Sequence, residues 1–198
     1  RALPPGRKSF DSVALGGGRG IRCDGENPPT PEAYAGMVLE ATGNLGCRLS
    51  FEPGRSLVGN SGILVTRVIY EKYGLAHRFV IVDAAMNDLI RPALYKAWHA
   101  IVPLQRPAAD AEWRPADIVG PVCESTDKFA EARALPPLNA GDRVAFLTAG
   151  AYGAVLSSEY NGRPRASEAV MRGGQWSFSR PPRTHDDLIR EQRLPAWL

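Results

Sequence analysis

A chain of 198 residues is long enough to bury a hydrophobic core, and this length predicts one or two domains. Its net charge of +3 rests on 20 arginines and only 4 lysines, and the arginines are scattered along the chain. That distribution argues against a nucleic-acid-binding surface. Because arginine binds carboxylate and phosphate in a bidentate way, it favours anionic small molecules as partners.

The three cysteines, Cys23, Cys47 and Cys123, are too few and too widely spaced for a disulfide framework or a CxxC metal site. We therefore expect no metal and a reducing, cytoplasmic compartment. No apolar run approaches the roughly 18 residues of a membrane span. The N-terminal RALPPGRK lacks the apolar segment of a secretory signal. The first residue is Arg1 rather than Met, which we interpret as the sign of a fragment or a processed product.

The first 60 residues predict a strand, a glycine turn, a helix and a second strand. FDSVAL at 10–15 is strand-like and is followed at once by GGGRG at 16–20. Thr30 is a good N-cap with Pro31 behind it, and apolar residues then recur with helical spacing up to Gly43 or Gly46. Leu49 to Phe51 form the next strand, which we expect to be buried. This order is typical of a βαβ unit in a parallel α/β fold.

The pattern changes after Gly62, where β-branched and aromatic residues dominate and predict an antiparallel β-domain. A short helix is expected near 87–97, a polar loop at 103–116, and a terminal helix capped by Thr184 with Asp187 three residues on. The strand-like segments are ILVTRVIYEKY (63–73), RFVIVDAA (78–85), 117–122, 143–149, 152–158, 166–171 and QWSFSR (175–180), the last closing a hairpin at Gly173-Gly174.

Several short motifs contain residues that could bind a ligand or take part in catalysis, and each also has a purely structural interpretation. GGGRG offers backbone N–H groups to a phosphate, or is a structural turn. In FEPGR, Glu52 and Arg55 flank a Pro-Gly turn that is a ligand site or a surface turn. Arg91 and Tyr95, four residues apart, clamp a carboxylate or belong to a surface helix. The remaining two motifs are GPVCESTD, which sets Cys123 beside Glu124, and AGAYGA, which sets Tyr152 between small residues; a core role is the alternative for Cys123 and Tyr152.

Taken together and in this order, the motifs resemble the diaminopimelate decarboxylases, pyridoxal-phosphate enzymes of the alanine-racemase fold type. The stretches that carry the resemblance are GGGRG, FEPGRSLVGNSGILVTRVIY, RFVIVDAAMNDLIRPALY, GPVCESTD and AGAYGAVLSSEYNGRPR. RPALY and PVCES separate the chain from the ornithine and arginine decarboxylase relatives. The resemblance runs from about Asp11 to the final helix, and Arg1–Phe10 matches nothing we identify.

The resemblance implies a fold class and a division of the chain. We expect the C-terminal part of a pyridoxal-phosphate-binding (β/α)₈ barrel at 1–60, an antiparallel β-domain at 61–183, and a helix with its tail at 184–198. The family works as a head-to-tail homodimer with shared active sites. Its barrel begins with a lysine that forms the Schiff base to the cofactor, and no matching motif surrounds any lysine here, namely Lys8, Lys72, Lys96 or Lys128.

The resemblance also assigns residues. Gly18, Glu52, Pro53, Gly54, Arg55 and Tyr152 are expected to hold pyridoxal 5'-phosphate, with Glu52 facing the pyridine nitrogen. Arg55, Arg91, Tyr95, Glu124 and Tyr152 are expected to bind the substrate, with Glu124 pairing with its distal ammonium. Cys123 is expected to give the proton that quenches the carbanion at Cα.

Two functions follow as hypotheses. The first is decarboxylation of meso-2,6-diaminopimelate to L-lysine and CO₂, with this chain carrying part of the site and inactive by itself. The second is a non-catalytic truncated homologue that serves as a dimerisation or regulatory module.

Overall fold

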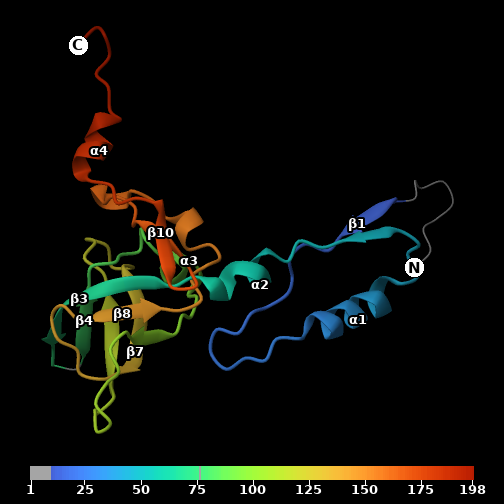
Figure 1. The fold of residues 1–198 in the computed structure, drawn as a ribbon, viewed down its shortest axis with the longest axis horizontal. Coiled ribbons are helices and arrows are strands. Elements are labelled where there is room, and N and C mark those ends of the chain that lie inside the picture. Colours follow the sequence, from blue (N-terminus) through green and yellow to red (C-terminus); the bar gives the residue numbers. More distant parts are fainter. Residues whose placement is uncertain (1–9, 76) are drawn as a thin grey trace.

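The computed structural model describes residues 10–75 and 77–198, which form a large curved sheet with a smaller unit on one side (Figure 1). The strands are β1 Ser12–Ala14, β2 Arg48–Ser50, β3 Leu64–Tyr73, β4 Arg78–Val82, β5 Ile101–Pro103, β6 Arg114–Val119, β7 Lys128–Leu135, β8 Arg143–Phe146, β9 Glu168–Arg172 and β10 Gln175–Arg180. The helices are α1 Pro31–Thr42, α2 Gly54–Val58, α3 Arg91–Tyr95 and α4 His185–Arg190, with 3₁₀ turns η1 Gly59–Ser61, η2 Ala154–Leu156 and η3 Tyr160–Gly162.

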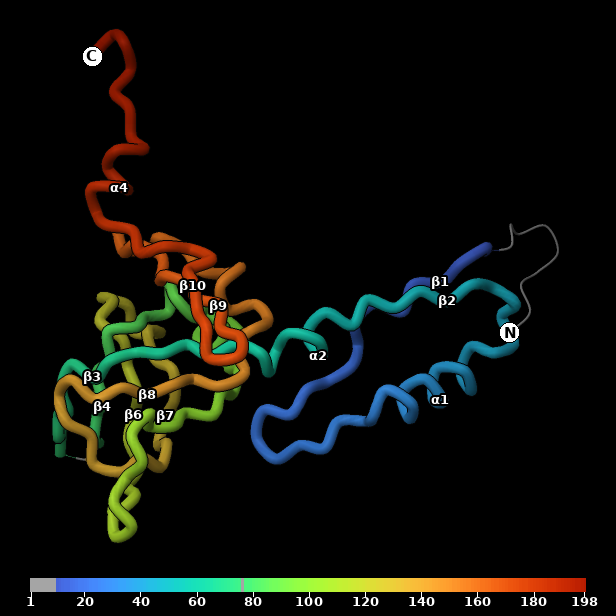
Figure 2. The backbone as a smooth tube through the Cα atoms, in the orientation of Figure 1, coloured from blue at the N-terminus to red at the C-terminus, as the bar shows by residue number. Residues whose placement is uncertain are grey.

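The N-terminal unit confirms the predicted strand–helix–strand order. β1 and β2 pair in parallel, with Val13 opposite Leu49, and α1 connects them (Figure 2). Thr30 caps α1 by accepting a hydrogen bond from the N–H of Ala33 at 3.2 Å, and the helix ends at Gly43.

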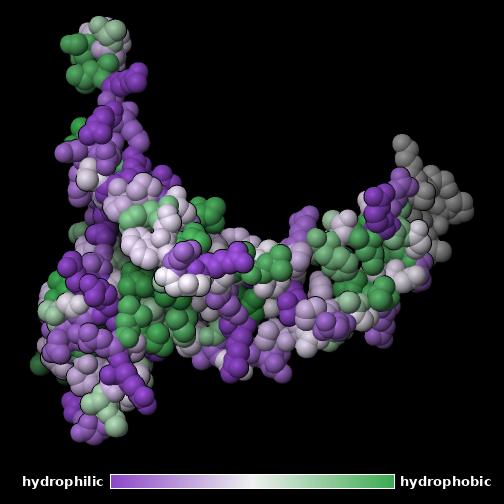
Figure 3. All heavy atoms as spheres, viewed as in Figure 1, coloured by the Kyte–Doolittle hydropathy of each residue, from purple (hydrophilic) through white to green (hydrophobic). Residues whose placement is uncertain are grey.

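This unit has no core of its own, so the expectation of a buried second strand was wrong. Leu49 is only half-buried, and no residue of α1 is buried. Two strands and one helix have too few layers to enclose a side chain. Met37 and Leu39 are more than half exposed, and Figure 3 shows apolar surface over this part of the molecule.

The large sheet has six strands in the order β5-β8-β3-β4-β6-β7. It is mixed: β4 and β6 run parallel with Val80 opposite Ile118, whereas the other four pairings are antiparallel, so the predicted antiparallel arrangement was wrong at this one pair. A parallel pair needs a long crossover, and residues 83–113, which include α3 and β5, provide it. The sheet curls into a nearly closed barrel. Arg133 of β7 donates a hydrogen bond to the carbonyl of His99, just before β5, at 2.8 Å.

The hydrophobic core lies inside this curled sheet. Along β4, Arg78, Val80 and Val82 are buried while the residues between them are half-buried, as the two-residue period of a strand requires. Phe129 and Phe146 bring β7 and β8 together, with ring centroids 4.6 Å apart. Burial of such side chains stabilises the fold by about 1.5–3 kcal/mol each. The sheet therefore provides the rigid frame from which the loops project.

Several predicted elements differ in the structure. The segment 152–158 is not a strand but a turn followed by η2, because Tyr152 has a left-handed backbone with φ 61°. The predicted helix at 87–97 shortens to α3, and the predicted loop at 103–116 shrinks to 104–113 between β5 and β6. Strand β7 was not predicted.

The C-terminal elements confirm the prediction. β9 and β10 form an antiparallel hairpin across Gly173-Gly174. Thr184 and Asp187 form a reciprocal capping box at the start of α4.

Among the described residues, no helix has the length and apolar character needed to cross a bilayer.

Candidate active site

The structure brings the glycine loop and the Glu52 turn together, as the sequence predicts. The parallel pairing of β1 and β2 continues past their ends, because the N–H of Glu52 donates to the carbonyl of Gly16 at 2.9 Å. A Cβ on Gly17 would lie 2.8 Å from the carbonyl oxygen of Glu52, so the two loops approach this closely only with glycine there. Gly18 has a left-handed φ of 51°, which also favours glycine. These contacts place Gly18 and residues 52–54 just beyond the carboxyl ends of β1 and β2.

Residues 52–55 form the start of a helix rather than an isolated turn. Pro53 is the N-cap of α2, and Gly54 and Arg55 are its first two residues. The N–H of Gly54 donates to the carbonyl of Glu52 at 2.8 Å. The N–H groups of Arg55 and Ser56 have no partner within the helix, since they belong to its first turn. Within the described ranges, no ion pair joins Glu52 to Arg55, and both side chains are exposed.

The residues just before Tyr152 are hydrogen-bonded to the segment that follows α2. The N–H of Ala149 donates to the carbonyl of Gly62 at 2.8 Å, and the N–H of Gly150 donates to the carbonyl of Gly59 at 3.0 Å. Tyr152 itself is half exposed, with a backbone conformation that L-residues other than Asn and Asp seldom adopt. Such strain costs about 1–3 kcal/mol and clusters at functional sites. The structure therefore links Tyr152, through its backbone neighbours, to the segment that follows Glu52 and Arg55.

Arg91 and Tyr95 both belong to α3 but differ in environment. Arg91 is 8% exposed, whereas Tyr95 is 62% exposed. Within the described part of the chain, no carboxylate pairs with Arg91 and its guanidinium donates no hydrogen bond. The guanidinium nitrogens of Arg91 nevertheless keep contact with solvent, so its charge is available to pair with an anionic ligand. Arg91 also contributes to the low pKa of the neighbouring His99, which burial lowers most.

Cys123 and Glu124 lie on an exposed loop between β6 and β7. The N–H of Thr126 and the hydroxyl of Ser125 both donate to Oε1 of Glu124 at 3.3 Å. These bonds, that of Thr126 first, hold the pKa of Glu124 below its usual value, so this side chain is an anion at neutral pH. All three cysteines are free thiols, and Cys123 is the exposed one.

The structure therefore gathers the expected residues into two groups. Gly18, residues 52–55 and Tyr152 are connected through backbone contacts around α2 and η1. Arg91, Tyr95, Cys123 and Glu124 lie on segments that meet at the turn between β4 and α3, where the N–H of Met86 donates to Asp127 at 2.7 Å. Among the described residues, no hydrogen bond joins Cys123 or Glu124 to the first group.

Sequence reasoning missed Asp127 and Arg163, which connect these loops. Asp127 follows Cys123 by four residues, and Arg163 donates a hydrogen bond to Asn87 at 3.0 Å. Both residues fall inside quoted motifs, GPVCESTD and YNGRPR. A charged residue at the junction of a loop with a buried strand was the signal that could have identified Asp127.

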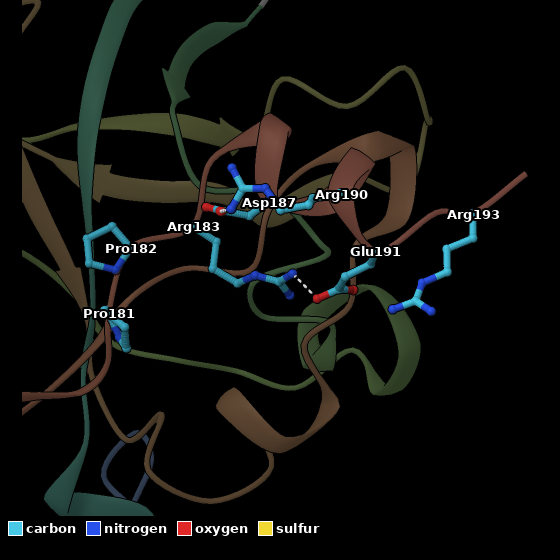
Figure 4. A pocket seen from close by; sticks show the side chains of 7 residues that line it. All are labelled: Pro181, Pro182, Arg183, Asp187, Arg190, Glu191 and Arg193. Atoms are coloured by element: carbon cyan, nitrogen blue, oxygen red, sulfur yellow. Dashed lines mark hydrogen bonds and ion pairs between the residues drawn. The ribbon is translucent and has the colours of Figure 1, made fainter.

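A pocket lies elsewhere, beside α4, and contains none of the expected site residues. Figure 4 shows Arg183 and Glu191 pointing toward one another across it, joined by an ion pair. Arg183 also donates to Glu159 at 3.0 Å, so its charge is balanced. This pocket gives no reason to move the candidate site.

No cluster of three or more His, Cys, Asp or Glu side chains suited to a metal ion occurs in the described ranges.

Comparison with known proteins decides the family. The profile described as "Pyridoxal-dependent decarboxylase, C-terminal sheet domain" matches residues 21–150. The chain belongs to the pyridoxal-dependent decarboxylase family. The resemblance stated from the sequence motifs is thereby confirmed, and pyridoxal phosphate is the cofactor of this family.

Within the family, the similar relatives are diaminopimelate decarboxylases. That of Zymomonas mobilis is 43% identical over 100% of this chain and 47% of its own length, and that of Archaeoglobus fulgidus is 44% identical over 94% of this chain and 45% of its own. The chain thus spans less than half the length of these relatives.

Solved structures that are similar to this chain are also diaminopimelate decarboxylases. Diaminopimelate decarboxylase from Helicobacter pylori, complexed with L-lysine, superposes with a TM-score of 0.81 at 41% identity, over 90% of this chain and 44% of that one. The enzyme from M. jannaschii in complex with L-lysine gives 0.83 at 33% identity, over 96% of this chain and 44% of that one.

Proposed function

We propose that this chain carries the C-terminal part of an enzyme that decarboxylates meso-2,6-diaminopimelate to L-lysine and CO₂. The observation that carries the proposal is the 43% identity to the Zymomonas mobilis enzyme over the whole chain. Two relatives whose structures contain L-lysine, the product of this reaction, support it. The proposal includes the division into the end of a (β/α)₈ barrel at 1–60, a β-domain at 61–183 and a tail at 184–198, and a cytoplasmic location.

The first group of residues fits the cofactor. Bound pyridoxal phosphate would supply an electron sink for the electron pair left at Cα when CO₂ departs. The exposed carboxylate of Glu52 would keep a proton on the ring nitrogen. Gly18 and the first turn of α2, which begins at Gly54, would offer N–H groups to the phosphate, those of Arg55 and Ser56 having no partner within the helix. Tyr152 would contact both cofactor and substrate. The close approach of Gly17 to Glu52 supports this assignment, because it sets the two cofactor-facing loops side by side.

The second group fits the distal end of the substrate. Arg91, with Tyr95 and Arg55, would bind the carboxylate that does not react, and Glu124 would bind the ammonium group beside it. The guanidinium of Arg91, which reaches solvent and has no acidic partner among the described residues, supports the first role. The lowered pKa of Glu124, an anion throughout the neutral range, supports the second. Together these residues would distinguish a substrate with two amino-acid ends from a simple amino acid.

Cys123 would donate the proton to Cα. Its thiol is exposed and free, and a positioned thiol can act as a general acid. We propose that it acts across a homodimer, with Cys123 and Glu124 of one copy completing the site built by Glu52 and Tyr152 of the other. The separate anchoring of the two groups of residues supports this arrangement.

The test joins this chain to the N-terminal part of the Zymomonas mobilis relative at the aligned position. The joined protein should release CO₂ from meso-diaminopimelate, form L-lysine, and restore growth without lysine to a bacterium that lacks the enzyme. A joined protein that is folded, binds pyridoxal phosphate and yet forms no lysine would refute the proposed function.

A second candidate is a non-catalytic dimerisation or regulatory module. The observation that favours it is the position of the described lysines: Lys72 lies in β3, Lys96 follows the end of α3 and Lys128 begins β7, so none of them belongs to the segment around Glu52. Lys8 is outside the described residues. The 198-residue chain alone should then bind the cofactor weakly and form no covalent adduct on borohydride reduction. A stoichiometric pyridoxyl-lysine together with CO₂ release from the chain alone would contradict this expectation.

A further inference from the structure

The turn at 83–89, between β4 and α3, is the point where the loops of the second group meet. It leads directly into Arg91 and Tyr95 on α3. On one side it contacts the segment 120–127 that carries Cys123 and Glu124. On the other side it contacts the segment 158–163, since Arg163 donates to the carbonyl of Asp83 at 2.6 Å. The turn is therefore placed to fix the segment that carries Cys123 and Glu124.

Asp127 makes the connection on the first side with both of its carboxylate oxygens. Oδ1 accepts a hydrogen bond from the N–H of Met86, and Oδ2 accepts one from the N–H of Val122, both at 2.7 Å. The residue is only 4% exposed. Burial raises the pKa of Asp127, while these two N–H groups oppose the rise.

The backbone of Asp127 closes the same loop. Its N–H donates to the carbonyl of Glu124 at 3.0 Å, and its carbonyl accepts from the N–H of Gly120 at 3.0 Å. The segment with Cys123 and Glu124 is thus held at both ends by one residue. Neither Cys123 nor Glu124 is buried, so these bonds rather than core packing fix where the two side chains lie.

Gly120 makes room for this carboxylate. A Cβ at that position would collide with both oxygens of Asp127 and would lie 2.7 Å from the carbonyl oxygen of Ala84. The carbonyl belongs to the backbone and cannot move aside as a flexible side chain could. A glycine here therefore lets the carboxylate sit between the two segments.

We propose that Asp127 is a positioning residue, whose carboxylate fixes the Cys123–Glu124 loop on the turn at 83–89 of its own copy. The inference rests on the proposed function for its effect on catalysis, but its structural part stands on the contacts alone. Asp127 itself touches no substrate. It acts by holding Cys123 and Glu124 where they meet the substrate, and a displacement of about 1 Å can cost 100-fold in rate.

The test variant is Asp127→Asn, which keeps the shape of the side chain. Its amide has only one acceptor oxygen, so its NH₂ group faces either the N–H of Met86 or that of Val122 and cannot accept from it. Amide hydrogen exchange at Met86 and Val122 is measured by NMR in the 198-residue chain. One of the two amides should exchange at least about tenfold faster. In the joined enzyme, kcat should fall on the order of 10- to 100-fold, and KM should rise as well, because the proton donor Cys123 and the substrate-binding Glu124 are displaced together.

Asp117→Asn is the matched control. Asp117 is also buried, at 7% exposed, and also accepts a backbone N–H, that of Ala132 at 2.8 Å, but it lies at the bulge between β6 and β7. Its variant should lose stability without losing kcat. An equal fall of kcat in both variants would overturn a specific role for Asp127.

Unchanged exchange at Met86 and Val122 would overturn the inference, as would faster exchange with an unchanged kcat. An inactive joined wild-type enzyme would overturn the proposed function instead, and the exchange result alone would then decide whether Asp127 holds the two segments. Should Asp127→Asn not fold, Gly120→Ala displaces the same carboxylate and gives the same two readouts.

Discussion

The ion pair between Glu71 and Arg78 is expected to contribute more to the stability of this chain than the other salt bridges of the sheet. Both side chains are less than 10% exposed. The carboxylate of Glu71 accepts four hydrogen bonds: two from Arg78, one from the hydroxyl of Tyr73 at 2.8 Å, and one from the N–H of Leu138 at 3.0 Å. Each oxygen takes one bond from Arg78 and one from another donor.

The perturbation is Glu71→Gln, and its cost follows from this geometry. Whichever way the amide is oriented, its nitrogen replaces an oxygen that accepted two bonds, and one of the two came from the buried guanidinium. The Tyr73 hydroxyl can reverse and accept, but Arg78 cannot. Losing one or two hydrogen bonds to a charged group, at about 1.5–3 kcal/mol each, gives an expected destabilisation of about 3 kcal/mol. This agrees with about 3–5 kcal/mol for breaking a buried ion pair.

The assay is urea unfolding of the 198-residue chain, followed by tryptophan fluorescence. With a slope of about 2 kcal/mol per molar urea, the midpoint should fall by about 1.5 M. Glu112→Gln is the control, since Glu112 forms an exposed pair with Arg114 at 2.6 Å and its loss should leave the midpoint unchanged. In a double-mutant cycle with Arg78→Met, the two substitutions should cost less together than their sum.

The pH dependence gives a second check. Burial by itself raises the pKa of Glu71, but the hydrogen bonds from Arg78, Tyr73 and Leu138 outweigh it and lower the pKa below its usual value. A lowered folded-state pKa contributes stability above the unfolded-state pKa of about 4.3, and this stability is lost as the pH falls. Wild-type stability should therefore drop below about pH 4.5 more steeply than that of Glu71→Gln. A midpoint for Glu71→Gln within error of the wild type, or strict additivity in the cycle, would refute the reasoning.

Three further predictions concern the site and its surroundings. Cys123→Ala in the joined enzyme should slow turnover by orders of magnitude and leave pyridoxal phosphate affinity nearly unchanged, with Cys47→Ala as control; an equal loss of cofactor affinity would make Cys123 structural. Arg91→Ala should weaken L-lysine binding by about 1.5–3 kcal/mol in calorimetry, since lysine keeps the distal end, and unchanged binding would contradict that role. Burial, with Arg91 as a smaller cause, lowers the pKa of His99, so stability should fall as the pH drops below about 6.5, and His99→Gln should flatten this dependence in urea midpoints between pH 7 and 5.

Features whose signals lie between neighbouring residues could be predicted from the sequence. Thr30 with Pro31, Gly173-Gly174, and Thr184 with Asp187 each specify a cap or a turn through bonds within four residues. The family was also recognisable from short motifs, because their chemistry depends on residue types in a fixed order.

The tertiary structure alone decided the features that depend on partners far along the chain. The parallel pairing of β4 with β6 spans the crossover at 83–113, and no local pattern distinguishes it from an antiparallel pair. β7 was missed because KFAEARAL alternates weakly and is rich in alanine, so its strand form comes from pairing with β6. In the sequence, nothing distinguishes Asp127 from other acidic loop residues. Its role as an acceptor depends on the N–H of Met86, which lies 41 residues away along the chain. Burial and long-range hydrogen bonds arise only when distant segments meet, which is why the sequence predicted the elements and the chemistry but not the connections between them.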